Sequence, residues 1–218
     1  MLQYYMFNKP RGYITARRDM RKATVMDFFP PKDREELFPV GRLDRDTEGF
    51  LLVTNDGELC FSLMSPDMNV PKTYFFWALG TLDSEKIGEI EGGVKIYETR
   101  PKTAPAKIEI TDVSTLGEIK ELLSDADKKI TNKRANLPVV SGLLTITEGK
   151  KHQVKRMLGY VGCRVVYLKR INIGGVMLDN SLAPGEYRPM TDEELEKIKN
   201  PCIQLKEPPK CDSRGERI

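Results

Sequence analysis

The chain has 218 residues, of which 39% are hydrophobic and 31% are charged, and this is enough to build one substantial domain or two small lobes. No stretch reaches the roughly 18 apolar residues that a membrane span requires, which excludes a membrane partner. The formal net charge of +3 is only mildly basic and by itself neither indicates nor excludes a nucleic-acid partner.

The charged residues are unevenly distributed along the chain. Lysine and arginine crowd into residues 9–22, 128–134 and 150–170, whereas acids gather at residues 83–91 and 192–196. This separation is what a basic surface facing a phosphate backbone requires. The four cysteines are widely spaced and form neither a CxxC pair nor a metal cluster with the single histidine, so we expect a reducing cytoplasm and no metal.

The first half of the chain predicts short strands and helices. The apolar N-terminus runs directly into Asn8-Lys9-Pro10-Arg11 without a cleavage signal, and we interpret residues 2–7 as a first strand. Residues 23–38 predict a short helix followed by a loop, because two adjacent prolines interrupt them. Further along, strands are predicted at residues 50–54 and 72–79, and a helix at residues 58–64.

The second half predicts the same mixture, which indicates an α+β fold. Helices are predicted at residues 84–90, 116–123, 152–161 and 192–199, and strands at residues 106–113, 143–147, 164–168 and 172–176. The helix at 152–161 carries an apolar stripe made of Val154, Met157, Leu158 and Val161. From residue 200 onward, proline and charge with few apolar residues predict a flexible tail.

A carboxylate between two arginines, Asp44, precedes the strand predicted at residues 50–54. The segment reads GRLDRDTEGFLLVTNDG from Gly41 to Gly57. Considered alone, it is better explained as a polar turn in which acids and bases neutralise one another. If Asp44 is instead buried at the floor of a cleft, a nearby cation would keep it ionised and available as a nucleophile. The neighbouring residues leave both interpretations open.

A second group of polar residues lies where a strand ends and a helix begins, in EGKKHQVKRM from Glu148 to Met157. A solvated basic helix face is the usual explanation of such a run. The alternative is a phosphate site, because amides at the helix N-terminus would add donors to the four cations of the segment. His152 has no partner cysteine or second histidine, so it is predicted to be structural or hydrogen-bonding rather than a metal ligand.

An aromatic strand supplies the third candidate, Tyr74 in Lys72-Thr73-Tyr74. Phe75, Phe76 and Trp77 are expected to include core residues. Alternation along a strand places Tyr74 on the face opposite Phe75, where its ring could stack on an extruded base.

Together these segments resemble one known family. GRLDRDTEGFLLVTNDG, then KTY, then EGKKHQVKRML at 148–158 and LKRINIG at 168–174 follow in the order found in ribosomal pseudouridine synthases of the RsuA type. Several separated motifs in one order are far more specific than a single short pattern. The resemblance covers about residues 2–190.

The resemblance implies a set of site residues. Asp44 corresponds to the catalytic aspartate, Tyr74 to the tyrosine that packs against the target uracil and is a candidate for proton transfer, and Lys155 to the basic residue that pairs with the aspartate. Residues predicted to bind RNA are Lys9, Arg11, Arg42, Lys150, Lys151, His152, Gln153 and Arg156.

The resemblance also implies an architecture and a substrate. We expect a pseudouridine synthase fold, with a mixed, mainly antiparallel sheet in two lobes and a central RNA-binding cleft, over residues 1–199, and a charged tail at 200–218. Many relatives begin with an S4-type RNA-binding domain, whereas here the catalytic domain is predicted to start at about Leu2. The chain therefore resembles the shorter members, several of which act on large-subunit RNA. We expect it to isomerise a 23S uridine as a monomer, binding ribosomal RNA or an assembly intermediate.

Two other functions remain open from the sequence. A non-catalytic ribosome-assembly protein on the same scaffold would keep the basic surface but would have no use for Asp44, Tyr74 and Lys155 together. A metal-dependent hydrolase built on Asp44, Asp46 and Asp56 would need converging oxygen ligands and usually another acid or histidine nearby. Pseudouridine formation needs no redox change and no group donor, which agrees with a sequence that has no dinucleotide or phosphate-loop fingerprint, so no cofactor is expected.

Overall fold

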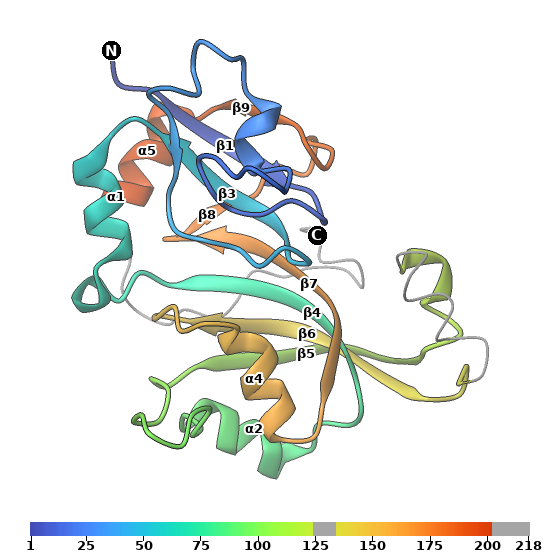
Figure 1. Ribbon diagram of the computed structural model, residues 1–218. Helices are drawn as coiled ribbons and strands as arrows, with labels where there is room; N and C mark the ends of the chain where they lie inside the picture. The colour runs from blue at the N-terminus through green and yellow to red at the C-terminus, as the bar shows by residue number, and fades with distance from the viewer. Residues whose placement is uncertain (124–133, 202–218) are drawn as a thin grey trace. The chain divides into compact units, whose positions relative to one another are not determined.

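The structure is a computed structural model that describes residues 1–123 and 134–201. It divides into two compact units (Figure 1). Of the described residues, unit 1 combines Met1–Lys72 with residues 169–201, and unit 2 consists of those between Thr73 and Leu168. Helices and strands occur in both units, and the sheet pairings include both parallel and antiparallel ones, so the predicted α+β class with a mixed sheet is confirmed.

Unit 1 is built from strands with two α-helices. Its elements are β1 (Tyr4–Lys9), η1 (Val25–Phe28), β2 (Phe38–Pro39), β3 (Glu48–Thr54), α1 (Gly57–Met64), η2 (Pro66–Met68), β8 (Val176–Met177), β9 (Tyr187–Pro189) and α5 (Asp192–Lys199), and the second half of β7 (Arg164–Ile173) belongs to it. Strand β1 lies between β9 and β3, antiparallel to both, and β3 continues the sheet through a parallel pairing with the end of β7.

The central strands of unit 1 are covered on both faces, which explains why FLLV in β3 is a continuous apolar run rather than an alternating one. Phe50 and Leu52 pack into a cluster with Leu59 and Leu63 of α1 and with Ile198 of α5, and Figure 1 shows both helices beside β1 and β3. On the opposite face aromatic rings fill the space, as Phe7 lies 5.7 Å from Phe29 between ring centroids. These strands form the rigid floor from which the loops of unit 1 project.

Unit 2 is a second group of strands with two α-helices. Its elements are β4 (Lys72–Leu79), α2 (Ser84–Glu91), β5 (Lys107–Thr115), η3 (Lys120–Leu122), β6 (Pro138–Ile146), α4 (Gln153–Tyr160) and the first half of β7. The strand order is β5-β6-β4-β7. The apolar stripe predicted for the helix at 152–161 is confirmed, because Val154, Met157, Leu158 and Val161 are all buried.

Most predicted elements occur within a few residues of their expected bounds, and two predictions are wrong. The helix expected at residues 116–123 is a series of turns ending in η3. The Leu116 and Gly117 amides donate to the carbonyls of Leu137 and Ala135, and the Leu122 and Leu123 amides donate to carbonyls three residues earlier instead of four. The strands expected at 164–168 and 172–176 are one strand, β7, which continues through Lys169-Arg170 and ends before Gly174. The tail predicted from residue 200 lies almost entirely outside the described residues.

Within the described ranges, no helix is long and apolar enough to cross a membrane. The described cysteines are Cys60, which is half-buried, and Cys163, which is buried, and both are free thiols. Burial raises the pKa of each thiol, so neither has the depressed value typical of a reactive cysteine.

Candidate active site

Asp44 lies in the connection between β2 and β3 of unit 1, and it is partly exposed while its neighbour Leu43 is buried. The Thr47 amide donates to the Asp44 carbonyl at 3.1 Å, which turns the chain immediately after the aspartate. The predicted position of Asp44 ahead of a strand is therefore confirmed. Such a position offers a side chain to solvent or substrate while the neighbouring strand fixes its backbone.

The backbone just before Asp44 is held by a hydroxyl group from another loop. The Thr15 Oγ1 atom donates to the Leu43 carbonyl at 2.8 Å and accepts the Leu43 amide at 3.1 Å. Thr15 is itself buried, so neither bond competes with bulk water. Thr15 thus satisfies both the carbonyl and the amide of Leu43, the residue before the aspartate, although no sequence motif predicted this role.

A buried lysine holds the backbone that follows Asp44. The Lys9 side chain is completely buried, and its Nζ atom donates to the carbonyls of Pro10 at 3.0 Å, Arg45 at 3.4 Å and Thr47 at 2.8 Å. In this conformation the ammonium group supports the aspartate loop, and the RNA contact predicted for Lys9 stays a prediction.

Arg45 ties the same loop to the turn after β1. Its Nε atom donates to the Gly12 carbonyl at 2.8 Å, and the Gly12 amide donates to the Arg45 carbonyl at 2.7 Å. Besides Lys9, two cations of this region, Arg11 and Arg42, are predicted to bind RNA. Arg42 is exposed, whereas Arg11 is half-buried. The arginines on either side of Asp44 thus have different surroundings, and Arg45 is a structural residue.

The strand that follows the aspartate loop approaches β7 unusually closely. Gly49 has a φ of +98°, and a Cβ atom built there would lie 2.2 Å from the Arg170 carbonyl oxygen. The Arg170 side chain is buried and its Nε atom donates to the Phe50 carbonyl at 2.8 Å. Nearby Lys72 is mostly buried, and its pKa falls to about 8, first because burial disfavours the ammonium ion and second because of the Arg170 charge. Unit 1 therefore holds two desolvated cations at the start of β4 and in β7.

Tyr74 lies in β4 of unit 2 and is 9% exposed. The aromatic residues that follow it, Phe75, Phe76 and Trp77, are buried as predicted. Trp77 in turn packs against Tyr167 of β7 with 4.7 Å between ring centroids. The tyrosine therefore sits on a strand that core packing immobilises, which is suitable for a residue that must present a ring in one orientation.

The segment that precedes α4 is organised by Glu148 and Gln153. The Glu148 Oε1 atom accepts the Ala104 amide at 2.9 Å and the Gln153 Nε2 group at 2.8 Å, while Gln153 Oε1 accepts the Lys150 amide at 2.8 Å. Gln153 is 3% exposed. Both ends of its amide are hydrogen-bonded inside the unit, which gives Gln153 a structural role, and its RNA contact stays a prediction.

The basic residues of this segment are also partly engaged. Lys150 Nζ pairs with Glu148 at 3.0 Å and donates to the Lys102 carbonyl, and the Arg156 guanidinium lies 4.3 Å from the centroid of the Tyr97 ring. Lys151 and His152 are exposed, and His152 adopts a left-handed backbone with a φ of +54°. Lys155 is half-buried on α4, between the apolar stripe and Arg156.

Asp56, one of the three ligands predicted for a metal-dependent hydrolase, has a different role. Asp56 caps α1 by accepting the Leu59 amide at 3.0 Å, and its other oxygen accepts the Tyr4 hydroxyl at 2.6 Å. These two bonds hold the pKa of Asp56 below its usual range, and the hydrogen bond to Asp56 is the main reason that the pKa of Tyr4 rises to about 12. Over residues 1–123 and 134–201, no group of three histidine, cysteine or acidic side chains is arranged to hold a metal ion.

Comparison with protein families decides the classification. A family model described as RNA pseudouridylate synthase matches residues 3–160, which is more than half of the chain. The chain belongs to this family. Its relatives among pseudouridylate synthases include an RNA pseudouridine synthase of Bacillus subtilis, named YtzG and described as uncharacterized, that is 47% identical over 199 residues, covering 91% of this chain and 74% of the relative.

Two further pseudouridylate synthases support the same assignment. Ribosomal small subunit pseudouridine synthase A of Escherichia coli is 35% identical over 196 residues, covering 90% of this chain and 74% of the relative. A crystal structure of a pseudouridylate synthase superposes with a TM-score of 0.74 at 35% identity, covering 91% of this chain and 74% of that one. The predicted resemblance and fold are therefore confirmed.

The three catalytic residues predicted for a pseudouridylate synthase come from both units. Asp44 belongs to unit 1, whereas Tyr74 and Lys155 belong to unit 2. Their approach to one another, and the cleft expected between the lobes, therefore remain predictions. Sequence reasoning missed Thr15, Arg170 and the supporting role of Lys9, because their importance comes from contacts with residues 28 to 120 positions away.

Proposed function

We propose that this chain converts a uridine of ribosomal RNA to pseudouridine and that Asp44 is the catalytic carboxylate. The observation that carries the proposal is the construction of the aspartate loop. Thr15 fixes the residue before Asp44, and Lys9 binds the carbonyls of Arg45 and Thr47 after it, while the aspartate itself stays partly accessible. A family of RNA pseudouridylate synthases provides the chemistry that such a preorganised carboxylate would serve.

The reaction needs little beyond binding and one nucleophile. The N1–C1′ bond of the uridine breaks, the uracil turns and C5 joins C1′, after which C5 loses its proton and the released N1 gains one. Electrons and atoms balance without an oxidant, a reductant or a group donor, so the proposal includes no cofactor. The target base must first leave its stack, at a cost of a few kcal/mol that RNA contacts would offset. Asp44 could attack C1′, attack the uracil ring or assist elimination at C2′, and each route uses the same carboxylate.

In this proposal the other site residues assist Asp44. Tyr74 stacks on the extruded uracil and is a candidate for moving the C5 proton, and Lys155 supplies the counter-charge of the aspartate. The exposed or partly exposed cations among the predicted RNA contacts bind the phosphate backbone. They are Arg11, Arg42, Lys150, Lys151 and Arg156, and His152 adds a hydrogen bond.

The ribosomal subunit is a separate question. Large-subunit RNA is the expectation stated above, whereas the relative from E. coli is named as a small-subunit enzyme. We therefore propose ribosomal RNA as the substrate class and treat 23S as the more specific hypothesis. Pseudouridine mapping in both purified ribosomal RNAs after incubation with the chain distinguishes the two subunits directly.

The decisive experiment compares wild-type chain with Asp44→Asn on ribosomal RNA. We expect the wild type to form pseudouridine at a defined position and Asp44→Asn to form none while binding the RNA as before, because the substitution removes the charge and little volume. Asp46→Asn, two residues away and exposed, is the matched control and should stay active. Excess chelator should leave the wild-type rate unchanged. An inactive wild type, or activity that survives Asp44→Asn or disappears with chelator, contradicts the proposal.

A further inference from the structure

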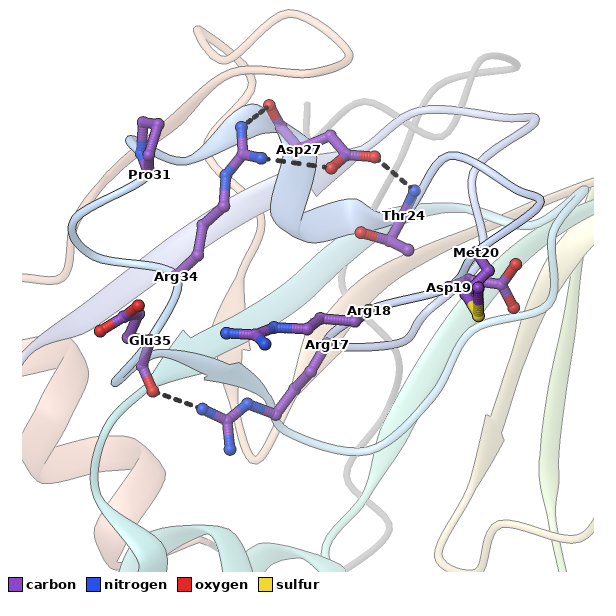
Figure 2. A pocket seen from close by; sticks show the side chains of 9 residues that line it. All are labelled: Arg17, Arg18, Asp19, Met20, Thr24, Asp27, Pro31, Arg34 and Glu35. Atoms are coloured by element: carbon purple, nitrogen blue, oxygen red, sulfur yellow. Dashed lines mark hydrogen bonds and ion pairs between the residues drawn. The ribbon is translucent and has the colours of Figure 1, made fainter.

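A pocket of about 530 Å³ opens in unit 1, outside the set of residues that we assign to catalysis (Figure 2). Its volume falls in the range of ordinary ligand sites and is sufficient for a nucleotide. Its lining comes from the segment after Thr15 and from the connection between η1 and β2. The lining residues are Arg17, Arg18, Asp19, Met20, Thr24, Asp27, Pro31, Arg34 and Glu35.

Three arginines and three acids line this pocket, but two of the acids already accept hydrogen bonds from nearby backbone amides. Asp27 accepts the Thr24 amide at 2.8 Å in the capping box of η1, and its other oxygen pairs with Arg34 at 3.4 Å. Asp19 accepts the amides of Arg21 and Lys22 at 2.8 and 2.9 Å. Within the part of the chain that the structure describes, neither carboxylate forms an ion pair with Arg17 or Arg18.

The remaining cations are Arg17 and Arg18, which Figure 2 shows extending side by side toward Glu35 and Arg34. Arg17 donates one hydrogen bond, to the Glu35 carbonyl. Among the residues that the structure describes, Arg18 forms no hydrogen bond or ion pair. Both arginines are exposed, so their planar groups are available for the bidentate contacts with phosphate that guanidinium favours.

The loop that carries them is closed at its base. The Ile14 amide donates to the Ala23 carbonyl at 3.1 Å and the Val25 amide donates to the Ile14 carbonyl at 3.0 Å, which brings the two ends together. A solvated cationic loop is the usual explanation of such a segment, but it does not account for a concave pocket between the loop and Arg34. The closed base also limits the entropy that the loop would lose on binding.

We propose that Arg17 and Arg18 form an RNA subsite that binds a phosphate of the single strand next to the target uridine, with the attached nucleotide in the pocket. The inference rests on the proposed function for the identity of the RNA. The subsite is linked to the aspartate loop through the chain, because Ala16 and Arg17 directly follow Thr15, whose hydroxyl holds Leu43. RNA bound at the subsite therefore positions the loop that carries Asp44.

The first test needs no variant. Hydrogen peroxide converts exposed methionines to the sulfoxide, and Met20, which lines the pocket, is 102% exposed, whereas Met1 at 111% is a matched internal control outside it. Oxidation is followed by mass spectrometry with and without a saturating single-stranded RNA of mixed sequence. We expect RNA to slow the oxidation of Met20 several-fold and to leave Met1 unchanged. Equal rates at Met20 with and without RNA overturn the subsite.

The second test removes the two arginines together. Arg17→Ala/Arg18→Ala should weaken binding of the same RNA on the order of tenfold and reduce the slope of log affinity against log salt by roughly 0.7 for each lost phosphate contact. The matched control, Arg164→Ala/Lys197→Ala, removes two exposed cations that do not line the pocket and should change affinity much less. Equal losses in the two double variants, or none in either, contradict the proposal.

The two hypotheses fail in different ways. If wild-type chain forms no pseudouridine but Met20 is still protected by RNA and the double arginine variant still loses affinity, the proposed function is wrong and the subsite stands. If wild type is active while Met20 is unprotected and the double arginine variant binds RNA normally, the function stands and the subsite is wrong. A protein ligand for the pocket would give this second pattern.

Discussion

Asp44 is surrounded by residues whose effects on turnover and on stability can be separated by substitution. Its closest supports are Thr15 and Lys9, which act on backbone atoms, and its proposed electrostatic partner is Lys155. Loss of a backbone support should disturb the loop and the fold together. Loss of a charge partner should affect the chemical step more than the binding of RNA.

Lys155→Met tests the loss of the proposed charge partner of Asp44. If Lys155 faces Asp44 during the reaction, the variant should lower the single-turnover rate at saturating RNA at least tenfold and leave RNA affinity nearly unchanged, since the aspartate loses its counter-charge. Lys155→Arg keeps the charge and should recover much of the rate if the site accepts a planar group. Weaker RNA binding with an unchanged single-turnover rate would make Lys155 a phosphate contact instead.

Lys72 gives a prediction about stability and pH. Its pKa of about 8 in the folded chain lies below the value of about 10.4 for an exposed lysine. Below pH 8 the folded chain therefore carries the full cost of a desolvated ammonium. Between about pH 8 and 10.4 the unfolded chain keeps a proton that the folded chain has released, so this cost diminishes as pH rises.

Lys72→Met should consequently stabilise the fold at pH 7, by about 2 kcal/mol. The gain should decrease when urea denaturation is repeated at pH 9.5, because wild-type Lys72 is then mostly neutral when folded. Lys197→Met, at an exposed position on α5, is the control and should show no such pH-dependent gain. A Lys72→Met chain that is less stable than wild type at pH 7 would show that Lys72 stabilises the fold at that pH.

At the scale of the elements, the contact between β3 and β7 depends on a missing side chain. Gly49→Ala adds a Cβ atom 2.2 Å from the Arg170 carbonyl oxygen and places alanine at a φ of +98°. We expect the free energy of unfolding to fall by about 3 kcal/mol or more. Gly57→Ala is the matched control, because nothing lies within 4 Å of its added Cβ at the start of α1. Similar denaturation midpoints for the two variants would contradict this account of the pairing.

Local patterns predicted most elements because their signals are local. The apolar stripe of α4 and the caps of α1 and α5 depend on residues three or four positions apart. The prediction failed where remote backbone groups decided the structure. The backbone amides of Leu116 and Gly117 donate hydrogen bonds to carbonyls near residue 135. Lys169-Arg170 is a strand despite two adjacent cations because it pairs with Glu48 and Gly49.

At the scale of the whole molecule, the uneven charge distribution predicts a marked salt dependence of RNA binding. If Arg11, Arg42, Lys150, Lys151 and Arg156 each neutralise one phosphate of single-stranded RNA, log affinity should fall with log salt with a slope of roughly −3.5, and more steeply if the arginine subsite also binds. Fluorescence anisotropy between 50 and 300 mM salt measures the slope. A slope near zero would contradict phosphate binding by these residues.

The motifs identified the candidate catalytic residues but not which of the cations are available to RNA. Lys9 and Gln153 resemble surface residues in the sequence, and each is buried with its polar atoms bonded inside its own unit. Conversely, the pocket beside Arg17 and Arg18 has no sequence signature, because it arises where the loop meets Pro31 and Arg34. A motif can indicate chemistry, whereas accessibility depends on the tertiary structure.

The burial of Lys9 also makes it a chemical reporter of motion in the aspartate loop. An amine that is completely buried and bonded to three carbonyls cannot react with a water-soluble acylating reagent unless those bonds open first. Its labelling rate relative to exposed Lys197 should therefore measure how often the loop opens, as hydrogen exchange does for amides. We expect Lys9 to label at least a hundredfold more slowly than Lys197 in the native chain. Saturating RNA should slow Lys9 further, and comparable rates for the two lysines would show that the loop is open much of the time.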